Sequence, residues 1–302
     1  MISAKGLSKK FEDTLAVDNL DLDIPEGQFF GLLGPNGSGK TTTIHMLSTL
    51  SLPTSGQITV DGFDVLRKPI VVRKNIGLVF QESALDRTMT VYENLSFSAS
   101  LYGIPKRTAD DRINALLKLF DLSDKKRSPV ARLSGGMRRA VDLIRGVLHK
   151  PKILFLDEPT VGLDLPSRRK IWRFVQQLIA EEKLTVILTT HYLEEATPCD
   201  RVCFIRKGKA VELGAPRELI DRLGDEIVEI EAEKPEEVVN LLDLKTSEYI
   251  VDSNALLIRS DRETTFDEIR KRLAGHQSKI LVRKTNLNDV FLWISSSGDL
   301  TT

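Results

Sequence analysis

The sequence lacks three features that mark large classes of protein: long apolar runs, frequent cysteines and an excess of one charge. No run of about 18 apolar residues occurs, so no membrane-spanning helix is expected. Residues 1–10 contain no apolar segment of a secretion signal. The two cysteines, Cys199 and Cys203, are too few for a disulfide framework. We therefore expect a cytoplasmic protein without a disulfide partner.

The charges balance, with 43 Lys and Arg residues against 43 Asp and Glu residues. A neutral chain without a basic block is a poor candidate for general nucleic-acid binding, so no nucleic-acid partner is expected. The content of 41% hydrophobic and 28% charged residues is typical of a folded globular protein. At about 150 residues per domain, 302 residues predict two domains.

The first two-thirds of the chain alternate short apolar runs with helical stripes. Continuous apolar or β-branched runs are typical of strands buried on both faces of a parallel sheet. They occupy residues 29–33, 76–80, 153–156 and 186–190. Stripes with the spacing of amphipathic helices run over residues 137–148 and 171–179. This alternation predicts an α/β fold with a mainly parallel sheet.

Two further parts of the chain have their own patterns. Residues 85–130 are mostly helical, with a break at Gly103-Ile104-Pro105, and resemble an insertion between two strands. After a predicted hairpin at 202–213 and a helix at 216–223, the pattern restarts. The predicted strands and helices then follow at 226–233, 235–244, 249–251, 255–258, 265–273, 279–282 and 288–294. Their order, β-α-β-β-α-β with a closing helix, favours a ferredoxin-like domain.

A glycine-rich loop joins the first apolar run to a helical pattern. Residues 34–41, GPNGSGKT, fit the phosphate-binding pattern G-x-x-x-x-G-K-[ST] in the context that this pattern requires. Its glycines let backbone N–H groups approach phosphates, Lys40 can reach the terminal phosphates, and the Thr41 hydroxyl can bind Mg²⁺. A turn that binds nothing is disfavoured because motif and context agree. The predicted nucleotide-binding residues here are Gly34, Asn36, Gly37, Ser38, Gly39, Lys40, Thr41 and Thr42.

Two acidic residues follow the apolar run 153–156. Ligands of open α/β sheets bind at the carboxyl ends of the strands, where Asp157 suits Mg²⁺ and Glu158 suits a base that polarises water. A capping pair before Pro159 is the alternative, and the phosphate loop disfavours it. Residues 133–137, LSGGM, open the helix that follows and form a second candidate anion site. Alone, this loop reads as an ordinary helix cap around Ser134.

With these motifs in order, the chain resembles the nucleotide-binding subunits of ABC transporters over residues 1–220. The matching positions are Phe11, residues 34–41, Gln81, residues 133–137, residues 153–158, residues 162–164 and His191. The resemblance implies a P-loop NTPase fold of the ABC ATPase type at residues 1–222, with a helical subdomain at about 85–150. The small α+β ferredoxin-like domain at 226–297 is expected to be accessory or regulatory.

The resemblance implies that the chain binds and hydrolyses ATP with Mg²⁺. Phe11 is implied to stack on adenine, and Gln81 to sense the γ-phosphate and Mg²⁺ and signal to a membrane subunit. His191 is implied to contact the γ-phosphate and help hold the attacking water. The implied catalytic residues are Lys40, Gln81, Glu158 and His191, and the implied Mg²⁺ ligands are Thr41, Gln81 and Asp157.

The same resemblance implies a head-to-tail homodimer, in which each ATP lies between one copy's phosphate loop and the other copy's signature loop, residues 133–137. Ser134 and Gly136, with Gly135 between them, are implied to bind the nucleotide held by the partner copy. Asp164 is implied to connect the two sites.

At two positions the chain departs from the common family pattern. Position 11 is Phe rather than Tyr, which still offers a π-face. Met137 stands where Gln is usual, and arginines follow it, which is similar to the drug- and polyketide-exporter (daunorubicin-resistance-like) branch. The tail at 287–292 also resembles that branch. The implied function is ATP hydrolysis that powers export through a separate polytopic membrane permease, on the cytoplasmic face of the membrane.

Two alternatives to the transporter subunit stay open. One is a soluble ABC ATPase that acts on nucleic acid or the ribosome; the single cassette, the absence of heptads and the balanced charge disfavour it. The other is a non-catalytic module gated by nucleotide, which the presence of Glu158 and His191 disfavours.

Overall fold

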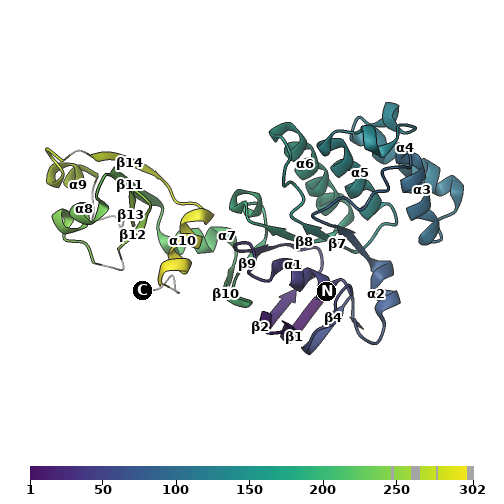
Figure 1. The fold of residues 1–302 in the computed structure, drawn as a ribbon, viewed down its shortest axis with the longest axis horizontal. Coiled ribbons are helices and arrows are strands. Elements are labelled where there is room, and N and C mark those ends of the chain that lie inside the picture. The colour runs from purple at the N-terminus through teal and green to yellow at the C-terminus, as the bar shows by residue number, and fades with distance from the viewer. Residues whose placement is uncertain (246–247, 260–265, 277, 298–302) are drawn as a thin grey trace. The chain divides into compact units, whose positions relative to one another are not determined.

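The computed structural model describes residues 1–245, 248–259, 266–276 and 278–297 (Figure 1). The chain divides into two compact units. Unit 1 comprises Met1–His191 and Cys199–Ala210, and unit 2 comprises Tyr192–Pro198 and Val211–Thr302. In the described ranges, no helix is both long and apolar enough to cross a membrane.

A six-stranded sheet carries the four apolar runs that the sequence pointed to. Its strands, in spatial order, are β10 (Lys209–Gly214), β9 (Arg201–Arg206), β3 (Phe29–Leu33), β8 (Thr185–Thr190), β7 (Ile153–Asp157) and β6 (Ile76–Val79). Strand β3 pairs in parallel with β8 and β9, and β7 pairs in parallel with β6 and β8. Every residue of β3, β7 and β8 is buried. The predicted α/β fold with a mainly parallel sheet is confirmed.

A second, antiparallel sheet lies in the first 64 residues, where sequence analysis found no strand before residue 29. Its strands, in spatial order, are β2 (Thr14–Ile24), β1 (Ile2–Phe11), β4 (Ser55–Val60) and β5 (Phe63–Asp64). Strands β1 and β2 alternate buried and exposed residues, because only one face is covered. The buried face shares one apolar core with the parallel sheet, where Ile2 and Leu20 join Phe30 and Phe155.

Helices cover both faces of the parallel sheet in unit 1. They are α1 (Lys40–Leu47), α2 (Pro69–Asn75), α3 (Val91–Leu101), α4 (Lys106–Leu119), α5 (Gly135–Val147) and α6 (Leu165–Glu182). Helices α5 and α6 lie on one side of β7 and β8, and α1 lies on the other (Figure 1). Between α3 and α4 the chain turns at Gly103, whose φ is 68°, within the expected break. Helix α3 begins with a capping box of Thr90 and Glu93.

Unit 2 contains a four-stranded sheet in which all pairings are antiparallel. Its strands, in spatial order, are β12 (Tyr249–Asp252), β13 (Ala255–Arg259), β11 (Glu226–Ala232) and β14 (Ser278–Lys284). Its helices are α7 (Pro216–Leu223), α8 (Pro235–Leu242), α9 (Phe266–Arg272) and α10 (Leu287–Ser297). Thr265, the expected first residue of α9, lies outside the described residues.

The core of unit 2 forms where α8 and α9 cover one face of this sheet. The face of β11 made by Val228, Ile230 and Ala232 is buried against these helices, as the alternation predicted. Helix α7 packs on α10, so the compact unit begins before the expected domain start at residue 226. At the start of α10, Asp289 is buried and accepts two hydrogen bonds of 2.8 Å from the guanidinium of Arg283.

Candidate functional site

The glycine-rich loop between β3 and α1 needs its glycines for space as well as for conformation. At Gly34 (φ 149°), a Cβ would lie 2.2 Å from the carbonyl oxygen of Ile205. At Gly39 (φ 109°), a Cβ would lie 2.5 Å from the carbonyl oxygen of Ala16. Gly39 is also the N-cap of α1, and its positive φ turns the chain into the helix. The loop can therefore present backbone N–H groups at a helix N-terminus, which is an anion site.

Lys40, the first residue of α1, is only 4% exposed. Its ammonium donates to the carbonyls of Gly34 at 2.9 Å and Pro35 at 3.1 Å. It also lies 3.8 Å from Oε1 of Glu158. Burial lowers the pKa of Lys40, whereas the charges of Glu158 and Asp157 raise it. A positive charge is thus held under the loop, facing the acidic end of β7.

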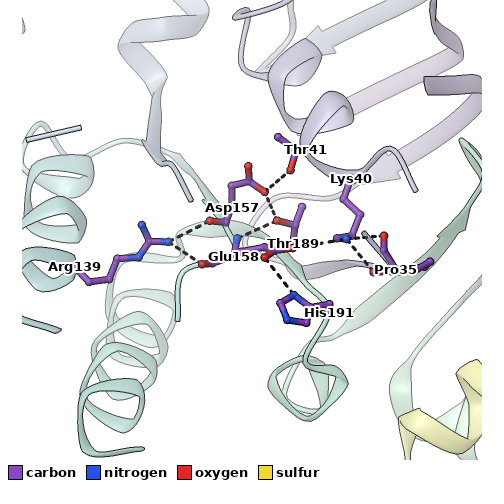
Figure 2. Close-up of polar contacts among 9 residues, drawn as sticks. Pro35, Lys40, Thr41, Arg139, Asp157, Glu158, Thr189 and His191 are labelled. Carbon is purple, nitrogen blue, oxygen red and sulfur yellow. Dashed lines mark hydrogen bonds and ion pairs between the residues drawn. The ribbon is translucent and has the colours of Figure 1, made fainter. Parts of the chain in front are cut away.

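The two acidic residues sit at the end of β7, as the sequence predicted. Oδ1 of Asp157 accepts hydrogen bonds from the hydroxyls of Thr41, at 3.1 Å, and Thr189, at 2.5 Å. Glu158 has a φ of 45°, and its N–H donates to the Thr189 carbonyl at 3.0 Å. This turn places Oε2 of Glu158 at 3.2 Å from Nδ1 of His191 (Figure 2). The structure therefore brings Lys40, Thr41 and His191 together around the two acids.

Sequence analysis gave no role to two residues of this group, Thr189 and Arg139. Thr189 lies on β8 and binds both acids, the carboxylate of Asp157 and the N–H of Glu158. Arg139 lies on α5, is 7% exposed, and points at the backbone beneath the acids (Figure 2). Its guanidinium donates to five backbone carbonyls, those of Phe80, Gln81, Asp157, Glu158 and Pro159. Burial lowers the pKa of Arg139.

The donor set fits a nucleotide with Mg²⁺. Oγ of Ser38 is buried in the loop and has no hydrogen-bond partner among the described residues, so it is available to a phosphate oxygen. The Thr41 hydroxyl and the Asp157 carboxylate adjoin each other, and both are oxygen ligands that Mg²⁺ accepts. In the described part of the chain, no three His, Cys, Asp or Glu side chains form a metal site by themselves. Mg²⁺ typically completes its coordination with water and substrate phosphates.

The side chains of Phe11, Gln81, Ser134 and Asp164 lie outside this bonded group, as far as the chain is described, and Gln81 joins it only through its carbonyl, which accepts from Arg139. Phe11, at the end of β1, is 48% exposed, and the Lys9 ammonium lies 4.8 Å from its ring centre. Gln81 follows β6 with an exposed side chain. Ser134 caps α5 by accepting the N–H of Met137 at 3.2 Å. Asp164 precedes α6 and is exposed.

The loop that contains Ser134 is open to solvent at its apex. Ser134 and Gly135 are exposed. Gly136 is packed so closely on α6 that a Cβ there would lie 2.3 Å from Oγ of Ser167. The N-terminus of the 13-residue helix α5 therefore faces outward with its first N–H groups near the surface.

Comparisons with known proteins agree with this arrangement. The profile of a family described as ABC transporter matches residues 17–161. The Nod factor export ATP-binding protein I of Mesorhizobium japonicum is 37% identical over 290 residues, which cover 95% of this chain and 84% of the relative. The daunorubicin resistance ATP-binding protein DrrA3 of Streptomyces coeruleorubidus is 38% identical over 304 residues, covering 97% of this chain and 95% of the relative. A solved ATP-binding cassette, a dimer in a post-hydrolysis state with ADP and Pi, is 27% identical with a TM-score of 0.66 and covers 71% of this chain and 98% of its own.

Proposed function

Because this chain belongs to the ABC transporter family, as an ATPase that energises an exporter, we propose that the group around Lys40, Asp157 and Glu158 hydrolyses ATP. The observation that carries the proposal is the meeting of a buried ammonium, a carboxylate and an imidazole at Glu158, which lies 3.8 Å from Lys40 and 3.2 Å from His191. Purified protein is expected to release phosphate from ATP when Mg²⁺ is present. Chelation of Mg²⁺ should stop the release, and phosphate release that persists without Mg²⁺ would contradict the proposal.

In this proposal each side chain has one task. The loop N–H groups, Ser38 and Lys40 bind the phosphates, and Phe11 stacks on adenine. Thr41 and Asp157, with Gln81, hold Mg²⁺, which neutralises charge on the β- and γ-phosphates. Glu158 accepts a proton from the attacking water, and His191, 3.2 Å from the Glu158 carboxylate, contacts the γ-phosphate and helps hold that water. The residues assigned to nucleotide binding in and just after this loop are Gly34, Asn36, Gly37, Ser38, Gly39, Lys40, Thr41 and Thr42.

We infer that two copies pair head-to-tail around two nucleotides. The solved relative with ADP and Pi is dimeric. In this chain the helix N-terminus at Ser134 is exposed, and its geometry suits an anion. This supports binding, at Ser134, of a phosphate of the ATP that the other copy holds. Gly135 and Gly136 let the backbone of the same loop approach that phosphate closely. Asp164, which is exposed at the start of α6, completes the contact with the other copy.

A groove in unit 1 supports docking of a separate membrane permease. It has a volume of about 520 Å³ and is lined chiefly by α3, by the segment after β6 and by the far end of α5. Phe97 and Leu101 line it and are 58% and 70% exposed, so an apolar partner surface would cover them. Arg145, which bonds the carbonyl of Ala84, lines the same groove. This proposal places the protein on the cytoplasmic face of the membrane, attached through the permease.

Leu101→Asp is expected to abolish co-purification with the membrane subunit, because a carboxylate at this exposed apolar position opposes burial against an apolar partner surface. The measurement is a pull-down of the tagged chain from gently solubilised membranes of its native cells, with ATP present. Leu119→Asp is the matched control, since Leu119 is also exposed, at 53%, but does not line the groove. Equal recovery of a polytopic membrane protein with both variants would remove the groove from this role.

We further propose that residues 226–297 form a ferredoxin-like accessory domain that stabilises the dimer or regulates the ATPase. The order β11-α8-β12-β13-α9-β14 and the sheet order β12-β13-β11-β14 support that fold. None of the residues assigned to nucleotide binding lies in this range. The ATPase domain of the proposal spans residues 1–222, with its helical subdomain at about 85–150.

A chain that ends at Gly224 is expected to keep its nucleotide site but to dimerise more weakly or to lose control of its ATPase rate. Sizing chromatography with ATP and steady-state phosphate release measure the two effects. Dimerisation, hydrolysis and transport equal to those of the full chain would refute the accessory role.

A further inference from the structure

Arg139 joins the helix that is capped by Ser134 to the backbone of Asp157 and Glu158. It lies in the second turn of α5 and is nearly inaccessible to solvent. Its Nε donates to the Pro159 carbonyl at 2.5 Å, and its Nη2 donates to the Glu158 carbonyl at 2.9 Å. Its Nη1 donates to the Phe80 carbonyl. This one side chain of α5 therefore connects its helix to the ends of two strands, β6 and β7.

The chemistry of this contact is specific to a guanidinium. Arginine offers five N–H donors in a planar fork, whereas lysine offers three on one nitrogen. The carbonyls of Asp157, Glu158 and Pro159 lie where the chain leaves the end of β7. A buried carbonyl without a hydrogen-bond donor costs free energy. The one fork supplies donors to all three and to the carbonyls of Phe80 and Gln81.

Arg139 binds a stretch of backbone that includes a residue in an unfavourable conformation. Glu158 has a φ of 45°, which is unfavourable for a residue with a side chain. Its N–H is held by Thr189, through the carbonyl at 3.0 Å and the hydroxyl at 3.1 Å. Its carbonyl is held by Arg139. With both peptide groups fixed, the Glu158 carboxylate is directed toward Lys40 and His191.

We propose that Arg139 is a positioning residue for ATP hydrolysis: it fixes the peptide of Glu158 and the start of the segment at Gln81 without touching nucleotide. This inference rests on the proposed role of Glu158 as the base. It deepens that role, because the orientation of the base then depends on a residue of the signature helix α5.

Arg139→Lys is expected to lower kcat by about 10- to 100-fold, since a displacement of roughly 1 Å at a reacting group can cost about 100-fold. The Kd for ATP is expected to stay within about twofold, because Arg139 contacts no part of the phosphate loop. Arg112→Lys is the matched control: Arg112 also ties a helix to α5, through the Leu148 carbonyl at 3.0 Å, far along α5 from the acids. That control should keep wild-type kcat.

A double variant separates positioning from a general loss of structure. If Arg139 acts through Glu158, adding Arg139→Lys to Glu158→Gln should lower the residual rate by no more than about twofold, since the two residues act as a unit. A full multiplicative loss in the double variant would overturn the proposal, and so would wild-type kcat in Arg139→Lys. Arg139→Gln, which keeps two N–H donors, gives the same comparison if the lysine variant does not fold.

Glu158→Gln measured alone separates the role of Arg139 from the role of Glu158. If Glu158→Gln alone kept wild-type turnover, the role of Glu158 would be wrong. If Glu158→Gln were inactive and Arg139→Lys fully active, only the positioning role of Arg139 would be wrong.

Discussion

Glu158→Gln is expected to lower the rate of ATP hydrolysis by ~10²–10⁴-fold, or roughly 2.7–5.4 kcal/mol of barrier, while ATP binding persists. Glutamine keeps the shape of glutamate and an oxygen that can face Nδ1 of His191, now at 3.2 Å from Oε2. The backbone contacts of residue 158 with Thr189 and Arg139 do not involve the side chain. The exchange therefore removes the proton acceptor and leaves the geometry in place.

The same variant should accumulate as an ATP-bound dimer on a sizing column, because binding continues without hydrolysis. Phosphate release under saturating ATP measures the lost step. Glu26→Gln makes the same chemical exchange at an exposed residue of unit 1 and should leave both readouts unchanged. Near-normal turnover in Glu158→Gln would exclude Glu158 as the base.

The parts of the fold that the sequence predicted well are those whose pattern is local. Strand β3 has the bounds expected from its apolar run, because a strand buried on both faces needs apolar residues at every position. Strand β6 ends one residue earlier than expected. Phe80 is as apolar as its neighbours, but its carbonyl is bound by Arg139 rather than by the next strand. This contact joins residues 59 positions apart, so no local pattern could show it.

The antiparallel sheet at the N-terminus was missed because its signal differs in kind. Strand β2 places exposed Asp and Asn residues between Val17, Leu20, Leu22 and Ile24, so it contains no continuous apolar run. The register of β1 on β2 is also irregular, which interrupts a strict alternation of period two. An argument from apolar runs alone finds only strands of the parallel sheet.

In the candidate site too, residues within one segment were predicted, and contacts between distant segments were not. Spacing within one segment predicted the glycine-rich loop before α1 and the two acids at the end of β7, since both patterns lie within a few consecutive residues. Thr189 reaches Asp157 across 32 positions of sequence, and Arg139 reaches Glu158 across 19. Threonine in a strand and arginine in a helix are common, so their roles follow only from the packing of β8 and α5 against β7.

Lys40→Ala is expected to abolish tight ATP binding, raising the Kd by about 10- to 150-fold for each charged hydrogen bond that is lost. The ammonium is the only side-chain cation placed among the predicted phosphate-loop residues 34–42, and a hydrogen bond to a charged group contributes about 1.5–3 kcal/mol. A filter-binding assay with labelled ATP measures the effect. Retention of tight binding in this variant would contradict the assignment of residues 34–41 as the phosphate loop.

Lys40→Ala should weaken ATP binding without unfolding the chain, and Lys40→Met distinguishes these two effects. Lys40 is buried, and burial lowers its pKa, so the folded chain holds this charge at a cost in desolvation. Methionine keeps the apolar stem and removes the charge, so Lys40→Met should unfold thermally near the wild-type temperature while binding ATP as poorly as Lys40→Ala. Recovery of ATP binding in Lys40→Met would show that the stem of Lys40, by shaping the loop, matters more than its ammonium.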